Sequence, residues 1–476
     1  MIPFRNVGRA LGHLAFVAAV VLGPTAAAPA PEEADPAAQA PAEANSAAAA
    51  RIDDLAAFRT RFFKREKSYS KEARTEAEGR LAVLEGRVRD ISSAAFELEL
   101  ARIVALADNG HTSYFPGPRS RRYNRAPIRL VPFGQDFYVL RARSEQADLL
   151  GARLVAIDGR PIDDLRALAR SLQGGTPAWR DRNAGYFLES PEQMHALAAV
   201  RSPEAATYTF AALDGRTIER RIAAEAPDPG RPRANASRWM WPAPLEGEGP
   251  DWRALLRPQR APWSLQDPDI PFRWRDAPDL DAVIVDLRRN DDAPDRPIFP
   301  FLKEVERERV RLGRSRVVLD MRFNGGGDLT TTAAFMQDWP GRIGPDGRLF
   351  VLTSPWTFSA GISSTGYLVQ AGGGRVTTVG ESPGDRLMFF SEGKPVELPS
   401  GTFIGLATER HDYHTGCRGF TDCHSNVVKR SIAVDTLDPA MAAPWTIDAY
   451  VAGRDPGMEA VATALAAARS SSLRLR

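Results

Sequence analysis

The sequence predicts a multidomain protein of the α/β class, with α+β organisation along the chain and a mainly parallel sheet in its C-terminal domain. From residue 281 onwards, short apolar runs alternate with amphipathic stretches of helix length, which is typical of a parallel sheet covered by helices. Residues 126–225 contain strand-like runs that end in Asp-Gly turns, which predicts a β-rich module. Residues 51–107 follow a helical period, which predicts an N-terminal helical region.

The composition is that of an ordinary globular protein. The chain has 476 residues, of which 43% are hydrophobic and 26% are charged. This length suggests about two or three domains. The 62 basic and 60 acidic residues leave a formal net charge of +2, so the charge gives no reason to expect nucleic acid as a partner.

The first 30 residues have the pattern of a secretory signal peptide. Arg5 and Arg9 precede an apolar stretch over residues 14–23, and small residues follow it. This stretch is too short to cross a bilayer, and no later segment has about 18 uninterrupted apolar residues. We therefore expect an exported protein, periplasmic or secreted, without a membrane span after signal cleavage. Residues 31–50 are rich in Ala, Pro and Glu, and we expect them to form a disordered linker.

Residues 51–125 are expected to form the N-terminal helical region. The helical pattern ends at residues 108–110, where Gly110 can take the left-handed conformation that closes a helix. His111 follows this end directly. Two interpretations of His111 stay open at this point: a surface-loop histidine, or a functional histidine if a partner lies elsewhere in the chain.

A separate module is expected over residues 126–225. The predicted elements are strands at 128–131, 137–140 and 152–157, a helix at 163–172 and a hairpin over 208–222. Part of this module, LLGARLVAIDGRPIDDL, resembles the core of PDZ domains, which bind an extended peptide as an added strand. Residues 226–280 follow as an irregular connector rich in Pro, Arg and Trp.

The C-terminal domain covers residues 281–476. Strands are expected at 282–287, 316–322 and 349–352, and helices at 301–312, 329–339 and 360–370. Three glycines, Gly325 to Gly327, lie at a strand-to-helix turn and allow a ligand to approach the backbone closely. The turn lacks the Gly-Lys-Ser/Thr ending of a phosphate-binding loop, so we interpret it as a source of N–H donors rather than as a nucleotide site.

Ser359 lies at the next turn, between the strand at 349–352 and the helix that begins at Ala360. The first N–H groups of a helix lack intrahelical partners and can stabilise an anion beside the hydroxyl, as acyl transfer requires. The alternative is that Ser359 is only the N-cap of this helix. A second serine, Ser382, stands in a G-x-S-x-G pattern, but Pro383 after it has no N–H for an oxyanion hole.

Four motifs occur in the order VVLDMRFNGGGD, LFVLTSPWTFSAGISS, VTTVGESPGD and VELPSG, and they resemble the catalytic core of the tail-specific, or C-terminal processing, serine peptidases. The NGHT motif at residues 109–112 and the PDZ-like module fit the same layout. The resemblance implies a core of the ClpP/crotonase type, a serine endopeptidase that cleaves polypeptides through an acyl-enzyme, and no cofactor. It also implies that Ser359 is the nucleophile, with Ala360 and Gly326 (or its neighbour Gly327) as oxyanion-hole donors.

The family has two branches, which differ in the general base. One branch uses a serine–lysine dyad, but the position where the resemblance would place the lysine holds Gly384, and the next lysine is Lys394. The other branch resembles tricorn and uses serine, histidine and an acid, which implies that His111 is the general base. The chain departs from many members of the family in having Gly361-Ile362, where they carry an acidic residue after the serine.

The resemblance also implies where the third catalytic residue lies: the family layout places it after the strand that follows the LPSG motif. We choose Asp412, because an acid that orients the histidine should lie close to the sheet. Asp435 is the main competitor, since relatives carry their acid shortly before the Asp-Pro turn. Glu409 lies nearer the strand but beside Arg410, so we interpret it as a solvated charge.

Cys417 and Cys423 are the two cysteines of the chain, and an exported protein favours a disulfide between them. Together with His411, His414 and His424 they also suggest the alternative of a zinc-binding protein, although we expect no metal. A further alternative is a peptide-binding protein on a catalytically degenerate peptidase fold. Nothing in the sequence predicts the oligomeric state.

Overall fold

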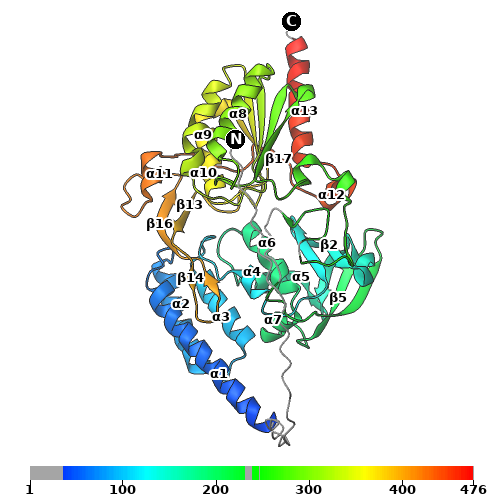
Figure 1. The fold of residues 1–476 in the computed structure, drawn as a ribbon, viewed down its shortest axis with the longest axis vertical. Coiled ribbons are helices and arrows are strands. Elements are labelled where there is room, and N and C mark those ends of the chain that lie inside the picture. Colours follow the sequence, from blue (N-terminus) through cyan, green and yellow to red (C-terminus); the bar gives the residue numbers. More distant parts are fainter. Residues whose placement is uncertain (1–35, 231–237, 246, 475–476) are drawn as a thin grey trace, which may run out of the picture. The chain divides into compact units, whose positions relative to one another are not determined.

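A six-stranded sheet in the C-terminal part of the chain carries the turns predicted to be functional (Figure 1). The computed structural model describes residues 36–230, 238–245 and 247–474. The strand order is β17-β12-β11-β10-β9-β8, and neighbouring strands are parallel except for β8 and β9. The strands are β8 (Phe272–Ala277), β9 (Ala282–Leu287), β10 (Arg316–Asp320), β11 (Arg348–Thr353), β12 (Val376–Gly380) and β17 (Met441–Ala442). The prediction of a mainly parallel sheet is confirmed.

The sheet is covered by helices on both faces, so its strands are apolar on both sides. Alternate residues of the central strands pack in two different clusters, as the period of two requires. Residues such as Val283, Val317 and Val351 pack with α8 (Ile298–Arg311), α9 (Thr330–Arg342) and α10 (Ala360–Gly372). Their neighbours, such as Ile284, Val318 and Leu352, pack with α13 (Pro456–Arg474).

A second, largely antiparallel sheet forms the expected β-rich module. Its strands are β1 (Ile128–Phe133), β2 (Asp136–Arg143), β3 (Arg153–Ile157), β4 (Arg160–Pro161), β5 (Ala205–Ala211), β6 (Thr217–Ala223) and β7 (Trp252–Ala254). Three helices pack beside this sheet: α5 (Ile162–Arg170), α6 (Pro177–Leu188) and α7 (Pro191–Ala196). The hairpin expected over 208–222 is confirmed as the β5–β6 pair, and the two sheets with their helices confirm the mixed α+β class.

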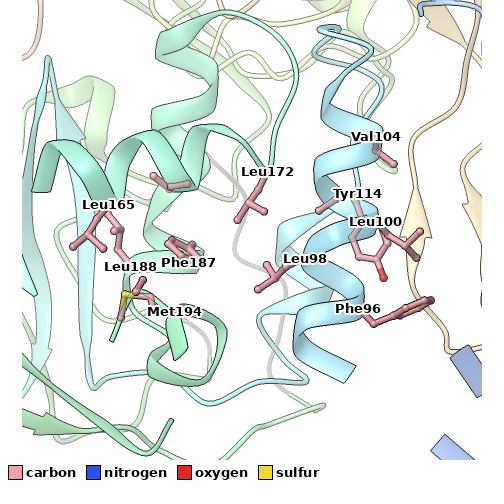
Figure 2. Packing of buried hydrophobic residues seen from close by; sticks show 14 of the residues in the cluster. Phe96, Leu98, Leu100, Val104, Tyr114, Leu165, Leu172, Phe187, Leu188 and Met194 are labelled. Carbon is pink, nitrogen blue, oxygen red and sulfur yellow. The ribbon is translucent and has the colours of Figure 1, made fainter. Parts of the chain in front are cut away.

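The N-terminal helices share one hydrophobic cluster with the β-rich module. These helices are α1 (Pro36–Ala57), the π-helix η1 (Phe58–Phe63), α2 (Lys71–Arg87), α3 (Ser93–Ala105) and α4 (Pro116–Arg119). Figure 2 shows Leu98 of α3 and Leu172, which follows α5, extending into the space between the two groups of helices. Ile404 and Leu406 from the C-terminal part of the chain belong to the same cluster. The loop after α3, which carries His111, therefore lies beside a cluster built from the N-terminal helices, the β-rich module and a segment of the C-terminal part.

The remaining elements are short. They are β13 (Met388–Glu392), paired with β16 (Ala407–Asp412), β14 (Val396–Glu397), paired with β15 (Phe403–Ile404), the helices α11 (Ser425–Lys429) and α12 (Ile447–Ala452), and the 3₁₀ turns η2 (Ser144–Leu149), η4 (Pro258–Arg260), η5 (Trp263–Leu265), η6 (Pro278–Leu280) and η7 (Gly373–Arg375). Within the described ranges, no helix has an apolar stretch long enough to cross a membrane.

The N-terminal part was expected to contain a signal peptide and a disordered linker. The expected signal peptide, residues 1–30, lies outside the described residues. Residues 36–50, part of the expected disordered linker, belong to helix α1, whose alanine-rich sequence has high helix propensity.

The end of α3 differs from its predicted form. The residue in the left-handed region is Asp108, with φ of 46°, rather than Gly110. Gly110 is needed for another reason: a Cβ atom there would lie 2.6 Å from Asp385 Oδ2 and 2.9 Å from the Phe358 ring.

A buried ion pair joins the end of β10 to the first turn of α13. The Asp455 carboxylate accepts hydrogen bonds from Arg322 Nη1 (2.7 Å), Arg322 Nη2 (2.8 Å) and the Ser264 hydroxyl (2.6 Å). Burial acts to raise the pKa of Asp455, but the Arg322 guanidinium outweighs it, so the pKa lies below its usual value. Arg322 is 2% exposed and also pairs with Asp320.

Asp455→Ala should destabilise the protein by about 3–5 kcal/mol, because the buried Arg322 would lose one of its two carboxylate partners. Urea unfolding of the full-length protein measures this change. Asp338→Ala is the matched control, since Asp338 pairs with Arg342 on an exposed helix surface, and it should cost at most about 1 kcal/mol. Equal losses for the two variants would show that the Arg322 cluster does not stabilise the fold as described.

Candidate active site

Ser359 occupies a strained turn between β11 and α10. Its φ of 53° and ψ of −123° lie in a region that few residues other than glycine adopt. It stands at the N-cap position of α10, but its side chain makes no capping hydrogen bond to the helix. The hydroxyl is therefore not used as a cap, and the N–H of Ala360 is the first donor of α10, a position that has no intrahelical carbonyl to bind.

The glycine turn lies directly against Ser359. A Cβ atom on Gly326 would be 2.5 Å from Ser359 Cβ, and Gly326 has φ of 100°, so glycine is required on both grounds. Asn324 holds the two segments together, because its backbone oxygen accepts a hydrogen bond from the Phe358 N–H (2.9 Å) and its side-chain oxygen accepts one from the Gly326 N–H (2.9 Å). The Gly326 N–H, an expected oxyanion donor, is thus already engaged within the turn.

The loop that carries His111 is fixed by its two neighbours in the NGHT motif. Asn109 exchanges two hydrogen bonds of 2.9 Å with the backbone of Phe390 in β13. Thr112 donates a hydrogen bond to the buried Glu66 (3.1 Å), which also accepts one from the Ala407 N–H (2.8 Å). His111 is therefore held between the N-terminal helices and the β13–β16 pair.

Ring stacking fixes the orientation of His111. Its imidazole lies 4.4 Å from the Phe358 ring and 5.0 Å from the Phe389 ring, with interplanar angles of 29° and 10°. The stack continues on both sides, with centroid distances of 3.8 Å for Trp179–Phe358, 4.9 Å for Phe389–His411 and 5.5 Å for His411–His424. We call this set of six rings the aromatic column: Trp179, Phe358, His111, Phe389, His411 and His424.

The carboxylate beside His111 is Asp385. Its Oδ2 atom lies 3.6 Å from His111 Nδ1, and its side chain is 1% exposed. Asp385 Oδ2 and both His111 ring nitrogens are buried and have no hydrogen-bond partner among the described residues. The structure thus brings His111 to Asp385 and to Phe358, the residue before Ser359, while no hydrogen bond between described atoms joins His111 to the Ser359 hydroxyl.

Asp412, the acid chosen from the sequence, lies away from His111 in this arrangement. Its carboxylate accepts hydrogen bonds from the His414 N–H (3.0 Å), the Thr415 N–H (3.0 Å) and the Thr415 hydroxyl (2.8 Å), all within its own turn. Of the two other acids considered, Glu409 binds His424 Nδ1 (2.7 Å) and Asp435 is exposed. Within the described parts of the chain, Asp385 is the carboxylate within 4 Å of His111.

The contact between Asp385 and His111 could not be predicted from the sequence, because it joins residues 274 positions apart. The available signal was the place of Asp385 in the VTTVGESPGD motif, one residue after the position where the other branch of the family carries its lysine. That position follows β12, the strand next to β11, and β11 leads into the turn that carries Ser359.

The zinc alternative is not supported. Cys417 and Cys423 form the expected disulfide. His411 is bound to Glu392 (3.0 Å) and to the Tyr413 hydroxyl (3.0 Å). No group of three or more potential metal ligands is found in the described residues.

Ser382, in the G-x-S-x-G pattern, is exposed and donates a hydrogen bond to Asp438 (2.6 Å). No helix begins after it, because residues 383 to 387 are irregular. The strand–turn–helix geometry that a nucleophile needs is found at Ser359 and not at Ser382.

Comparison with known proteins was made by sequence and by structure. No protein-family model and no curated protein sequence matches the chain. Among solved structures, mature CPAF complexed with lactacystin is 12% identical, covers 88% of this chain and 98% of its own, and has a TM-score of 0.50. The photosystem II D1 C-terminal processing protease (13% identity, 87% and 97% covered, TM-score 0.37) and the tricorn protease (12% identity, 87% and 36% covered, TM-score 0.35) also match. At this level of identity the match shows a shared fold: the chain has the fold of mature CPAF.

Gly326→Ala should lower peptide turnover by about 100-fold, because the new methyl group would displace Ser359 by a fraction of an ångström or more. Steady-state hydrolysis of a denatured protein substrate measures this loss. Gly325→Ala is the matched control, since a Cβ atom there would meet nothing within 4 Å, and it should be nearly neutral. Full activity in Gly326→Ala would contradict the placement of this glycine against Ser359.

The buried side chain of His411 should make the free energy of unfolding depend on pH. Burial lowers the pKa of His411 below its ordinary 6.5, against the opposing effect of Glu392. The folded state therefore binds fewer protons than the unfolded state between the two pKa values. This contribution to stability is fully present above pH 6.5 and is lost as the pH falls toward the folded-state pKa. His411→Gln should flatten the loss of unfolding free energy between pH 7.5 and 5.5, measured with urea; an unchanged profile would contradict this assignment.

Proposed function

We propose that this protein is an exported serine endopeptidase that cleaves polypeptides through an acyl-enzyme, in the manner of the tricorn-like branch. The observation that carries this proposal is Ser359, which sits in a strained strand-to-helix turn with a hydroxyl that is not used as a cap. A half-buried histidine, whose two ring nitrogens are buried and have no partner among the described residues, stacks on Phe358, the residue before Ser359. Structural features of this kind are kept at a cost in stability, which points to a function.

In the proposed mechanism, His111 accepts the proton of the Ser359 hydroxyl while the oxygen attacks the peptide carbonyl. The N–H of Ala360 stabilises the resulting oxyanion. Because Asn324 engages the Gly326 N–H, we assign the second donor to Gly327. His111 then protonates the leaving amine, and water releases the acyl group by the reverse proton path.

We propose Asp385 as the third member of the triad, in place of Asp412. The acid has to hold the histidine tautomer and stabilise the imidazolium that forms. Asp385 Oδ2 supports this role because it is buried, lacks another partner and lies 3.6 Å from His111 Nδ1. The contact is longer than a hydrogen bond, and such contacts tighten when substrate closes the site.

The finer features of the fold enter the proposal as well. The central sheet with its covered faces fits a ClpP/crotonase-type core, and the β1–β6 module with α5 fits a PDZ-like domain that would bind an extended peptide. The N-terminal sequence supports export through a signal peptide at residues 1–30. The disulfide between Cys417 and Cys423 fits an oxidising compartment.

The proposal predicts which acid is needed for turnover. Asp385→Asn should lower the turnover number by about 10³–10⁴-fold without loss of folding, because the amide would stabilise the wrong histidine tautomer. Asp412→Asn should cost stability in its turn but leave turnover per folded molecule within about threefold. Hydrolysis of fluorescently labelled, denatured casein measures both, with Ser359→Ala as the inactive baseline.

If Asp412→Asn lost its turnover and Asp385→Asn kept it, the third member of the triad would be Asp412. A wild-type protein no more active than Ser359→Ala would favour the degenerate, peptide-binding alternative.

A further inference from the structure

A cavity of about 460 Å³ opens beside His111 and Phe358. One face of α6 forms a wall of this cavity, with Trp179, Arg182, Asn183 and Tyr186 at the spacing i, i+3, i+4 and i+7. Trp239, from the connector, adds a further aromatic wall and contacts the Tyr186 ring at 5.3 Å. The size is within the range of sites that enclose small ligands.

The carboxylates among the described lining residues of the cavity are all paired with arginines. The charged residues along it are Arg121, Arg125, Arg129, Arg141, Arg182, Glu189 and Glu248. Both glutamates are already paired: Glu189 with Arg125, and Glu248 with Arg129 (3.1 Å) and Arg141 (2.9 Å). Among the described lining residues, both glutamates are thus engaged by arginines other than Arg182.

Arg182 is the cation for which the described residues supply no counter-charge. Its Nε and Nη1 atoms are buried and have no hydrogen-bond partner, and no ion pair involves it. Its guanidinium lies 4.3 Å from the centre of the Trp179 ring and 5.6 Å from that of Trp239. Burial lowers the pKa of Arg182 to about 9, so it remains charged at neutral pH. A desolvated cation without a partner costs free energy, and a bound anion would offset that cost.

The cavity is also connected to the reacting groups. The Trp179 ring contacts Arg182 and stacks on Phe358 at 3.8 Å, and Phe358 stacks on His111 at 4.4 Å. The Trp179 ring therefore lies between Phe358 and a group bound at Arg182. His111 lines the same cavity. This is where a residue flanking the scissile bond would be accommodated.

We propose that this cavity binds a carboxylate group carried by a peptide, with the Arg182 guanidinium as its partner and Trp179 and Trp239 packed around its apolar stem. Its use as a substrate-recognition site rests on the proposed peptidase function; the binding itself does not. A guanidinium matches the planar carboxylate and donates two hydrogen bonds to it. The carboxylate comes from an acidic side chain or from a chain terminus.

Binding is measured by the change in total tryptophan fluorescence of the full-length Ser359→Ala protein, so that no peptide is cut; Trp179 and Trp239 are the two of its nine tryptophans that line the cavity. The probes are Ac-AAEAA-amide, Ac-AAQAA-amide and the free acid Ac-AAQAA. A peptide with a carboxylate should bind about tenfold more tightly than the glutamine amide, as expected for a charge-assisted hydrogen bond. Tighter binding of the glutamate amide alone assigns the site to an acidic side chain, tighter binding of the free acid alone assigns it to a chain terminus, and tighter binding of both shows that the site accepts either carboxylate.

Arg182→Met, in the same Ser359→Ala background, should abolish the preference for the carboxylate without lowering the thermal stability, because it removes a half-buried cation that has no ion-pair partner among the described residues. Arg216→Met is the charge-matched control, since Arg216 is exposed and pairs with Asp214 in the β5–β6 turn. Equal binding of all three peptides, or a carboxylate preference that survives Arg182→Met, would overturn the proposal. Because the assay needs no turnover, an inactive wild type would refute the peptidase function and leave this result standing.

Discussion

Stacking of the His111 imidazole between Phe358 and Phe389 is the contact on which the candidate site depends. Histidines in catalytic sites are often oriented by hydrogen bonds to a ring nitrogen, but both ring nitrogens of His111 are unpaired here among the described residues. Offset aromatic pairs contribute about 0.5–1.5 kcal/mol each beyond their buried area, enough to select one ring orientation. Phe358 precedes Ser359 in the chain, so the same contact fixes the histidine relative to the serine.

Close packing around these rings explains the glycines of the site. Gly110 has no room for a side chain because of Asp385 and Phe358, and Gly326 has none because of Ser359. Each glycine allows segments far apart in the sequence to approach within van der Waals contact. The strain at Ser359 is maintained by this packing and by Asn324, which ties the glycine turn to the residue before the serine.

The periodic parts of the C-terminal domain could be predicted from the sequence, because alternating strands and helices leave a clear local pattern. The strand predicted at 282–287 has the bounds of β9, and the helix predicted at 360–370 lies within α10. Ser359 could be found for the same reason, since its strand–turn–helix context is local. The positions of Asp385 and of the aromatic column could not, because they depend on contacts between residues 111, 179, 358 and 385. Asp412 looked suitable beside its strand, and its use within its own turn becomes visible only with the backbone in place.

The central claim is that His111 activates Ser359, and the rate of covalent labelling by a diphenyl phosphonate tests it most directly. The reagent reports nucleophile activation without requiring a known peptide substrate. We expect labelling of the wild type at Ser359 and a rate about 10²–10⁴-fold lower in His111→Gln, since the general base would be absent. An equal labelling rate in the two proteins, or labelling at a residue other than Ser359, would contradict the account.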